Sequence, residues 1–308
     1  MNKEEPIIKN KKSYKSIIKK NLTAWLIMIP SLILFAFFVW IPLGKNIVVS
    51  FFNDYSYEEF VGFSNYQSIF ADDAFLAALG NTFKYILWSL LIGFLVPMLI
   101  GFLLSECIHL KGFFRVAIYI PCMISGIAVV FLFKNIYGDE SYSILNVIST
   151  ALGGNSHLWA SNVNLIIPLI VLAMTWRGAG GTALIYLSNF QQIDNSMYEA
   201  ARVDGATPIQ RFMRITLPTM KSTIVMLLVL QIISVFQVFY EPLVIGNWGG
   251  PVNNASMTLM LLAYKYSFVD FEYAKGAATS IVLALIIVVF TVIYFLITNY
   301  FKKKEGDK

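Results

Sequence analysis

Residues 196–218, with the sequence SMYEAARVDGATPIQRFMRITLP, form a polar stretch between two long apolar runs. Ser196 followed by Glu199 predicts a capping box at the start of a helix, in which the hydroxyl accepts from the Glu199 amide and the carboxylate reaches back to the Ser196 amide. Gly205 supplies the left-handed residue that ends this helix. The first half of the stretch is therefore predicted to be one short helix.

The second half of the stretch has its own start and stop signals. Thr207-Pro208 predicts a cap followed by a first-turn proline, and Pro218 is expected to end the helix that follows. Each helix is shorter than the roughly 12 residues needed for stability in isolation, so both need a surface on which to dock. One face of the first helix would present Met197, Ala200, Ala201 and Asp204.

The rest of the chain has the composition of a membrane protein. Hydrophobic residues make up 57% of its 308 residues and charged residues 13%, and the mean hydropathy is +0.68, whereas soluble domains carry about 25% charged residues. Continuous apolar runs of about 20 residues predict membrane-spanning helices and not β-barrel strands. We therefore predict an all-α integral membrane protein with six transmembrane helices. The predicted spans are residues 24–44, 83–105, 114–134, 164–188, 221–245 and 277–300.

Lysines gather at both ends of the chain. Seven precede the first predicted span and four follow the last, which places both termini in the cytoplasm by the positive-inside rule. Six crossings then put residues 106–113 and 189–220 inside. Residues 45–82 carry five acids and one lysine, and residues 135–163 carry acids without a base, as expected outside. The formal net charge of +5 is thus a signal of topology and does not indicate a nucleic-acid partner.

These signals divide the chain into three parts. Residues 1–23 are a basic cytoplasmic tail, residues 24–302 a multi-pass transmembrane domain in the cell membrane, and residues 303–308 a second basic tail. The transmembrane domain includes the polar loop 189–220 between the fourth and fifth spans, and a short helix is expected around residues 144–152 of the third connection.

The sequence contains no recognisable catalytic set. It has no HExxH, no GxSxG with a partnering His, no CxxC and no GxxxxGK[ST] phosphate loop, which predicts a chain that is not an enzyme and does not bind ATP by itself. Cys107 and Cys122 lie at or inside apolar runs without a His at metal spacing. We expect them to be small buried hydrophobes, with no disulfide and no metal site.

A charged residue inside the fourth apolar run is a candidate for function. Arg177 would cost several kcal/mol there unless it pairs, snorkels or faces water, so we expect it to point inward. Gly178, Gly180 and Gly181 follow it and remove side chains, which lets a ligand or a neighbouring helix approach the backbone.

The fifth apolar run carries a polar face. Gln231, Ser234 and Glu241 follow helical spacing through Val238, with Gln237 adjacent. Such residues either line a solute pathway or only fasten the bundle by interhelical hydrogen bonds. We favour lining for Arg177 and Glu241, which could pair with each other, and leave both roles open for the glutamines. The predicted mid-membrane cavity is lined by Trp176, Arg177, Gln231, Ser234 and Gln237.

The polar loop resembles the cytoplasmic loop of permease subunits of ABC importers. That loop reads Glu-Ala-Ala, three residues, Gly, nine residues, Ile-x-Leu-Pro, which here is Glu199-Ala200-Ala201, Gly205 and residues 215–218. Gly249-Gly250-Pro251 after the fifth span and Gly276-Ala277-Ala278 at the entry to the sixth are similar to the carbohydrate branch, the maltose and multiple-sugar permeases. The resemblance covers roughly residues 20–302.

The resemblance implies a role for the loop. In that family the two loop helices sit in a groove of a separate ATPase subunit and transmit its closure to the membrane helices. The ATP and Mg²⁺ are bound by that partner, so no cofactor is expected in this chain. The implied coupling residues are Glu199, Ala200, Ala201, Gly205 and Pro218.

The resemblance also implies a substrate site. Maltose-type permeases hold the sugar from the helices before and after the loop. Arg177 stands where that relative has an aliphatic residue, and Val235 and Val238 stand where it has asparagines, which leaves room for an acidic sugar or another anion. The matching positions are Trp176, Arg177, Gly178, Gly181, Gln231, Ser234, Val235 and Val238.

The expected function is therefore a permease subunit of an ATP-driven importer for a sugar or oligosaccharide. Expected partners are the ATPase, an extracytoplasmic solute-binding protein and a second permease, because one chain offers one loop and a two-ATP machine needs two; a homodimer stays open. An ABC permease for a non-sugar or anionic solute is one alternative, and a stand-alone secondary transporter is another. A DNA-binding helix-turn-helix is set aside, because only Arg211 and Arg214 would be free for phosphates.

Overall fold

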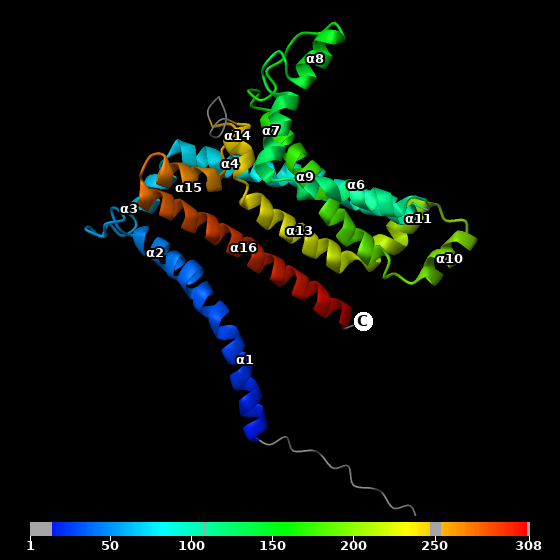
Figure 1. Ribbon diagram of the computed structural model, residues 1–308, viewed down its shortest axis with the longest axis horizontal. Helices are drawn as coiled ribbons and strands as arrows, with labels where there is room; N and C mark the ends of the chain where they lie inside the picture. The colour runs from blue at the N-terminus through cyan, green and yellow to red at the C-terminus, as the bar shows by residue number, and fades with distance from the viewer. Residues whose placement is uncertain (1–13, 108, 247–253, 307–308) are drawn as a thin grey trace, which may run out of the picture.

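The computed structural model describes residues 14–107, 109–246 and 254–306, and within these ranges the chain is helical apart from one isolated bridge between Phe52 and Phe60. The first span is a single rod made of α1 (Tyr14–Phe35), the π-helix η1 (Ala36–Trp40) and α2 (Ile41–Val49). Figure 1 shows the α1 part of this rod pointing away from the other helices, whereas α2 lies beside the start of α16 (Tyr273–Gly306), and none of the apolar window of the rod is buried. The predicted span 24–44 is thus confirmed, within a longer helix.

The second span is also one continuous rod. It consists of α4 (Asp73–Trp88), the π-helix η2 (Ser89–Phe94) and α5 (Leu95–Glu106), and it begins well before the predicted residue 83. The short α3 (Ser64–Phe70) precedes it. The Asp72 side chain accepts a hydrogen bond from the Ala74 amide at 2.8 Å and so caps the rod at its first turn.

The predicted third span, 114–134, is not a straight helix. The structure has α6 (Lys111–Met123) and α7 (Gly126–Tyr137), bent by 95° at the break between them. Pro121 removes a backbone donor near the end of α6, and Ile124 and Ser125 take extended ψ angles of 138° and 136°. The short helix expected around residues 144–152 is present as α8 (Ile144–Ala151), which lies at the far end of a projecting loop in Figure 1.

The remaining spans match their predictions with one interruption. α9 (Ile166–Phe190) and α16 (Tyr273–Gly306) are continuous, whereas the fifth apolar run divides into α13 (Lys221–Phe236) and α14 (Tyr240–Val244), so Gln237 and Glu241 do not share one helix. α15 (Leu259–Phe268) precedes α16. Residues 249–251, part of the predicted resemblance, lie outside the described residues. Five helices and the one bent pair thus account for the six predicted spans.

The loop between α9 and α13 contains the two predicted short helices, with corrected ends. α10 (Asn195–Val203) is capped by Asp194, which accepts from the Ser196 amide at 2.9 Å, so the predicted capping box of Ser196 and Glu199 is wrong. Asp194 caps the helix in place of Ser196 because its carboxylate reaches the second amide of the helix directly. The backbone hydrogen bond from Ser196 also lowers the pKa of the Asp194 carboxyl.

The second loop helix begins as predicted and ends later. Thr207 caps α11 (Pro208–Arg211) in a full capping box with Gln210, and the helix continues through the π-helix η3 (Phe212–Thr216) and α12 (Leu217–Thr219). Pro218 therefore does not end it. The helix continues for one residue beyond Pro218, to Thr219, because the fixed φ of a proline is compatible with helical backbone, and it ends at Met220, where ψ is 6°.

Two large hydrophobic clusters hold the bundle together, and a third, small one packs Val49 of α2 on Ala274 and Ala277 of α16. The larger of the first two includes Ile170, Phe236 and Leu259, from α9, α13 and α15, and the second includes Tyr186, Phe190 and Phe212, from α9 and the loop. Within the described residues, the second cluster packs apolar side chains of the loop against those of the membrane helices.

Candidate functional site

A cavity of about 420 Å³ opens between η2 and α5, α9, α13 and α14. Among the α9 residues that line it, those at 171, 174, 175, 178 and 182 have the spacing of one helical face, and Arg177 and Ala179 lie beside that face. Among the residues that line it are Ser89, Gly93, Pro97, Thr175, Arg177, Gly178, Thr182, Gln231, Ser234, Gln237, Val238, Tyr240 and Glu241. The structure thus brings together six of the eight residues predicted for the solute pathway: Arg177, Gly178, Gln231, Ser234, Gln237 and Glu241.

Arg177 reaches the cavity while it closes the broken third span. Its Nε donates to the carbonyl oxygen of Ile124 at 3.3 Å, which is one of the carbonyls at the end of α6 that the bend leaves without a helical partner. The guanidinium lies against Gly126 at the start of α7, since a Cβ built there would be in van der Waals contact with Arg177 Cζ at 3.5 Å. The arginine therefore joins α9 to the bend and adds a positive charge to the cavity wall.

The polar face of α13 makes a hydrogen bond to a neighbouring helix and also lines the cavity. Gln231 Nε2 donates to Ser89 Oγ at 2.6 Å and ties α13 to η2, and Gly93 leaves the space that this amide fills. Gln237 is exposed and donates to the Ile233 carbonyl of its own helix at 3.3 Å. The amide of Gln231 is hydrogen-bonded between helices and also lines the cavity, so the fastening role is confirmed for Gln231, and its role in a solute pathway stays a prediction.

Glu241 lies in the first turn of α14 and is 7% exposed. A carboxylate at a helix N-terminus is stabilised by the amide groups that point toward it. It lines the same cavity as Arg177, so one cationic and one anionic side chain share a wall with several hydroxyl and amide groups. This is a polar chamber suited to a ligand with many hydroxyl groups, because each hydroxyl both donates and accepts.

Two predicted pathway residues lie elsewhere. Trp176 packs on Phe133 with ring centroids 5.6 Å apart, and the Gly181 amide donates to Cys122 Sγ at 3.2 Å. Their partners belong to α7 and α6, so both residues face these helices and not the cavity. Trp176 differs from its neighbour Arg177 because adjacent residues in a helix point about 100° apart. Val235, implied by the resemblance, is buried in the larger hydrophobic cluster.

Four polar residues of the cavity were missed by sequence reasoning. Ser89, Thr175, Thr182 and Tyr240 line it, but single hydroxyl residues in apolar runs are common and give no signal alone. The spacing of Ser89, Gly93 and Pro97, four residues apart in sequence, was the one clue that the second span also faces the cavity.

The loop helices expose an apolar surface that is unusual for a polar segment. Val203 is 89% exposed, Ile209 69% and Met213 58%. Glu199 and Ala200 are exposed, and Gly205 between the helices has φ +78° with nothing within 4 Å of a Cβ built on it. The position thus needs the left-handed backbone that was predicted, while its surroundings are open.

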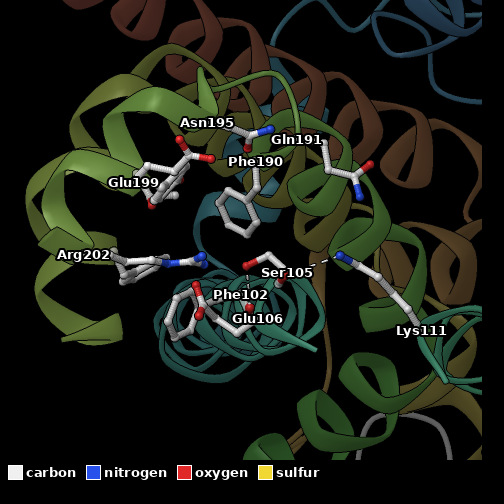
Figure 2. A pocket seen from close by; sticks show the side chains of 12 residues that line it. Phe102, Ser105, Glu106, Lys111, Phe190, Gln191, Asn195, Glu199 and Arg202 are labelled. Atoms are coloured by element: carbon white, nitrogen blue, oxygen red, sulfur yellow. Dashed lines mark hydrogen bonds between the residues drawn. The ribbon is translucent and has the colours of Figure 1, made fainter. Parts of the chain in front are cut away.

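A second cavity, of about 250 Å³, lies behind α10. Figure 2 shows Arg202 of α10 pointing toward Ser105 and Glu106 at the end of α5, with the Phe190 ring between the two elements. The loop is therefore held beside α5 by side chains. Its lining includes Phe102, Ser105, Glu106, Lys111, Phe190, Gln191, Asn195, Tyr198, Glu199, Arg202, Phe212 and Thr216.

Comparison with known proteins identifies similar chains. The family described as "Binding-protein-dependent transport system inner membrane component" matches residues 89–306. The arabinooligosaccharides transport system permease protein AraP of Bacillus subtilis (strain 168) is 32% identical over 285 residues, which is 92% of this chain and 90% of that protein. The multiple sugar-binding transport system permease protein MsmF of Streptococcus mutans serotype c is 30% identical and covers 90% of this chain and 96% of its own length.

Solved structures share the fold. A bacterial ABC transporter involved in the import of the acidic polysaccharide alginate matches with a TM-score of 0.83 at 23% identity, covering 92% of this chain and 97% of that chain. A bacterial alginate ABC transporter in complex with an alginate pentasaccharide-bound periplasmic protein matches with a TM-score of 0.80 at 24% identity. The predicted all-α membrane fold and the predicted resemblance to sugar-type ABC permeases are confirmed.

Proposed function

We infer the function from the family to which this chain belongs, the inner membrane components of binding-protein-dependent transport systems, and propose that it is the permease subunit of an ATP-driven importer of sugars or oligosaccharides. The observation that carries the proposal is the polar cavity of about 420 Å³, two of whose walls, α9 and α13, continue directly into the loop. The names of AraP and MsmF support a carbohydrate cargo.

The loop between α9 and α13 is the proposed docking site for an ATPase. Its exposed apolar side chains, Val203, Ile209 and Met213, would be buried in a groove of that subunit. Glu199, Ala200, Ala201 and Gly205 lie on or beside this exposed surface, and Pro218 lies in the short α12 that leads back to α13. ATP and Mg²⁺ would be bound by the ATPase, and this chain contributes no phosphate loop.

The proposed orientation puts the loop and both termini in the cytoplasm of a cell whose membrane holds the chain. The lysines at the two ends and the acids of residues 45–82 support it through the positive-inside rule. A solute-binding protein would then deliver cargo on the opposite side, as the family description suggests. A second, similar permease would complete the pathway, because the exposed loop of one chain can engage one ATPase.

Alternating access would work through the cavity walls. Docking and closure of the ATPases would move α9 and α13 together with the loop that joins them, so that the cavity opens to one side and then to the other. Arg177 and Glu241 would bind the cargo or each other according to the state.

Uptake by the assembled transporter tests this proposal. The chain with its ATPase, second permease and binding protein is reconstituted in proteoliposomes that contain ATP, and radiolabelled arabinotriose, maltotriose, lactose and digalacturonate are offered one at a time. We expect ATP-dependent accumulation of at least one of them. Accumulation that follows an ion gradient and persists without the ATPase would instead support a secondary transporter, and would contradict the proposal.

A further inference from the structure

The cavity has one wall without a chain connection to the loop. α9 leads directly into the loop and α13 leads directly out of it, whereas the wall formed by Ser89, Gly93 and Pro97 belongs to η2 and α5. If the loop moves, α9 and α13 follow covalently. The wall formed by α5 has no such covalent link and can follow only through its packing on α9 and its side-chain contacts with the loop.

An ion pair between a buried arginine and a partly exposed acid makes one of these contacts. Arg211, at the end of α11, donates from Nη2 to Glu106 Oε2 at 2.9 Å, and the two side chains are 6% and 32% exposed. Glu106 is the last residue of α5, where the helix dipole disfavours an acid. The acid therefore gains its favourable interaction from Arg211 and not from its own helix.

Arg211 depends on this acid more than Glu106 depends on the arginine. Its Nε and Nη1 are buried and have no hydrogen-bond partner among the described residues. Removing one member of a buried pair leaves an uncompensated charge and is strongly destabilising locally. Loss of Glu106 would thus release Arg211 from α5, because water is the only other way to solvate the guanidinium.

An aromatic contact seals the same junction. The rings of Phe102 on α5 and Phe212 on η3 have centroids 4.5 Å apart, and Phe212 is 7% exposed. Tyr198 of α10 shares a hydrogen bond of 2.8 Å with Thr216 of η3, which ties the first loop helix to the second. α10, η3 and the end of α5 are thereby linked in series beside the cavity of Figure 2.

We infer that Glu106 and Arg211 are positioning residues for transport: their ion pair carries the movement of the loop to α5, so that the third wall of the cavity moves with the other two. The inference rests on the proposed function. It distinguishes this pair from one that only fastens the fold, because it predicts a loss of coupling between ATP hydrolysis and uptake in a protein that remains assembled.

The experiment compares charge variants in the reconstituted transporter, with uptake and ATP hydrolysis measured in the same vesicles. The cargo is the oligosaccharide of the set above that the unmodified transporter accumulates. For Glu106→Gln and Glu106→Arg we expect uptake per ATP to fall at least about fivefold, the lower end of usual coupling effects. ATP hydrolysis should stay within about twofold, because the docking surface on α10 is unchanged.

Charge exchange supplies the rescue. The double variant Glu106→Arg with Arg211→Glu restores the attraction in reverse order, and we expect uptake per ATP to return to within about threefold of the unmodified value, since residues in direct contact are coupled. Asp270→Ala is the matched control, because it removes an exposed ion pair with Lys265 that lies far along the chain from the loop. It should leave uptake per ATP unchanged.

Three outcomes would contradict the inference. Unchanged uptake per ATP in Glu106→Gln and Glu106→Arg would show that α5 does not depend on the pair. The second is that uptake, ATP hydrolysis and the thermal midpoint all fall together and that the charge exchange does not restore them. The pair would then only stabilise the fold. Absence of ATP-driven uptake in the unmodified transporter would overturn the proposed function itself, and it is seen before any variant is compared.

Discussion

Each end of the long rod from Asp73 to Glu106 is held by an acid and a base, but the two pairs differ in what they hold. At the N-terminal end, Asp72 Oδ2 accepts from Lys275 Nζ of α16 at 2.8 Å and from Tyr266 Oη of α15 at 2.6 Å. At the C-terminal end, Glu106 is paired with Arg211 of the loop. The first pair joins helices of the membrane bundle to one another, and the second joins the bundle to a segment outside it.

The position of each acid on the rod explains the difference. Asp72 also caps the rod, so its charge stabilises the helix as well as the contact with α16. Glu106 stands where its charge disfavours the helix, and its pairing favours the loop instead. The N-terminal end is thus built as an anchor, and the C-terminal end as a connection that can transmit movement.

The largest effect is expected from a glycine near the C-terminal end. A Cβ at Gly101 would lie 2.9 Å from both the Ala183 carbonyl oxygen and Tyr186 Cβ of α9, too close for either backbone to stay in place. We expect Gly101→Val to cost at least about 2 kcal/mol through overpacking. The measurement is the yield of folded protein in detergent and its thermal midpoint.

The matched control lies nearer the other end of the rod. Gly80 of α4 has nothing within 4 Å of a Cβ built on it, so Gly80→Val should leave the thermal midpoint unchanged or raise it slightly. Equal losses in the two variants would mean that the two halves of the rod pack alike, and the comparison would fail.

The next effect concerns the loop itself. Gly205 has φ +78°, which a β-branched residue adopts only with strain. We expect Gly205→Val to reduce ATP-driven uptake to background while the protein stays inserted, because α10 and α11 lose their relative orientation. Gly205→Asn is the matched variant, since asparagine tolerates the left-handed region. It should retain most of the uptake, and equal loss in both variants would point to an effect of size and not of backbone.

Local signals were sufficient for the loop and for most spans. Gly205, Thr207 and the apolar runs act within a few residues of themselves, so their structural consequences could be read from the chain. The cap at Asp194 was missed because Ser196 and Glu199 offered an equally good local pattern two residues later. The bend after Met123 was missed because hydropathy reports a preference for lipid and does not report where a helix turns.

The candidate site was predicted only as far as helical spacing reaches. Gln231 and Ser234 follow from one face of one helix, but Trp176 was placed with its neighbour Arg177 although the two point in different directions. The pairs at the ends of the rod could not be predicted at all. Glu106 and Arg211 are 105 residues apart and Asp72 and Lys275 are 203 apart, and no local pattern joins partners at such separations.

A substitution in the cavity leaves the ion pairs at both ends of the rod intact, so its effect on uptake can be compared with the effects of substitutions at those ends. Arg177→Leu removes the charge of the cavity wall and the hydrogen bond to Ile124. We expect uptake to fall about tenfold, with a larger loss for digalacturonate than for maltotriose, because an arginine pairs with a carboxylate more strongly than with a hydroxyl. Uptake and competition assays measure this. Arg177→Lys keeps the charge and should retain more uptake of the acidic sugar, and an unchanged preference in both variants would remove Arg177 from cargo recognition.

The smallest effect on uptake is expected at the N-terminal anchor, where the contribution of Asp72 to stability depends on pH. Burial raises the pKa of the Asp72 carboxyl, but hydrogen bonds from Lys275, Tyr266 and the Ala74 amide outweigh it and hold the pKa at about 2. Because this pKa lies below the unfolded value of about 4, the paired carboxylate adds stability above pH 4, and that stability is lost as the pH falls from about 4 to about 2. The contribution is on the order of 2 kcal/mol at neutral pH, since the side chain is only 26% exposed.

Asp72→Asn keeps an acceptor for the cap and loses the charge, so its thermal midpoint should be lower than that of the unmodified protein at pH 7 and should meet it near pH 2. Uptake per ATP should not change, in contrast to the Glu106 variants. A loss of uptake per ATP in Asp72→Asn at pH 7 would mean that both ends of the rod transmit movement, and the distinction between anchor and connection would be wrong.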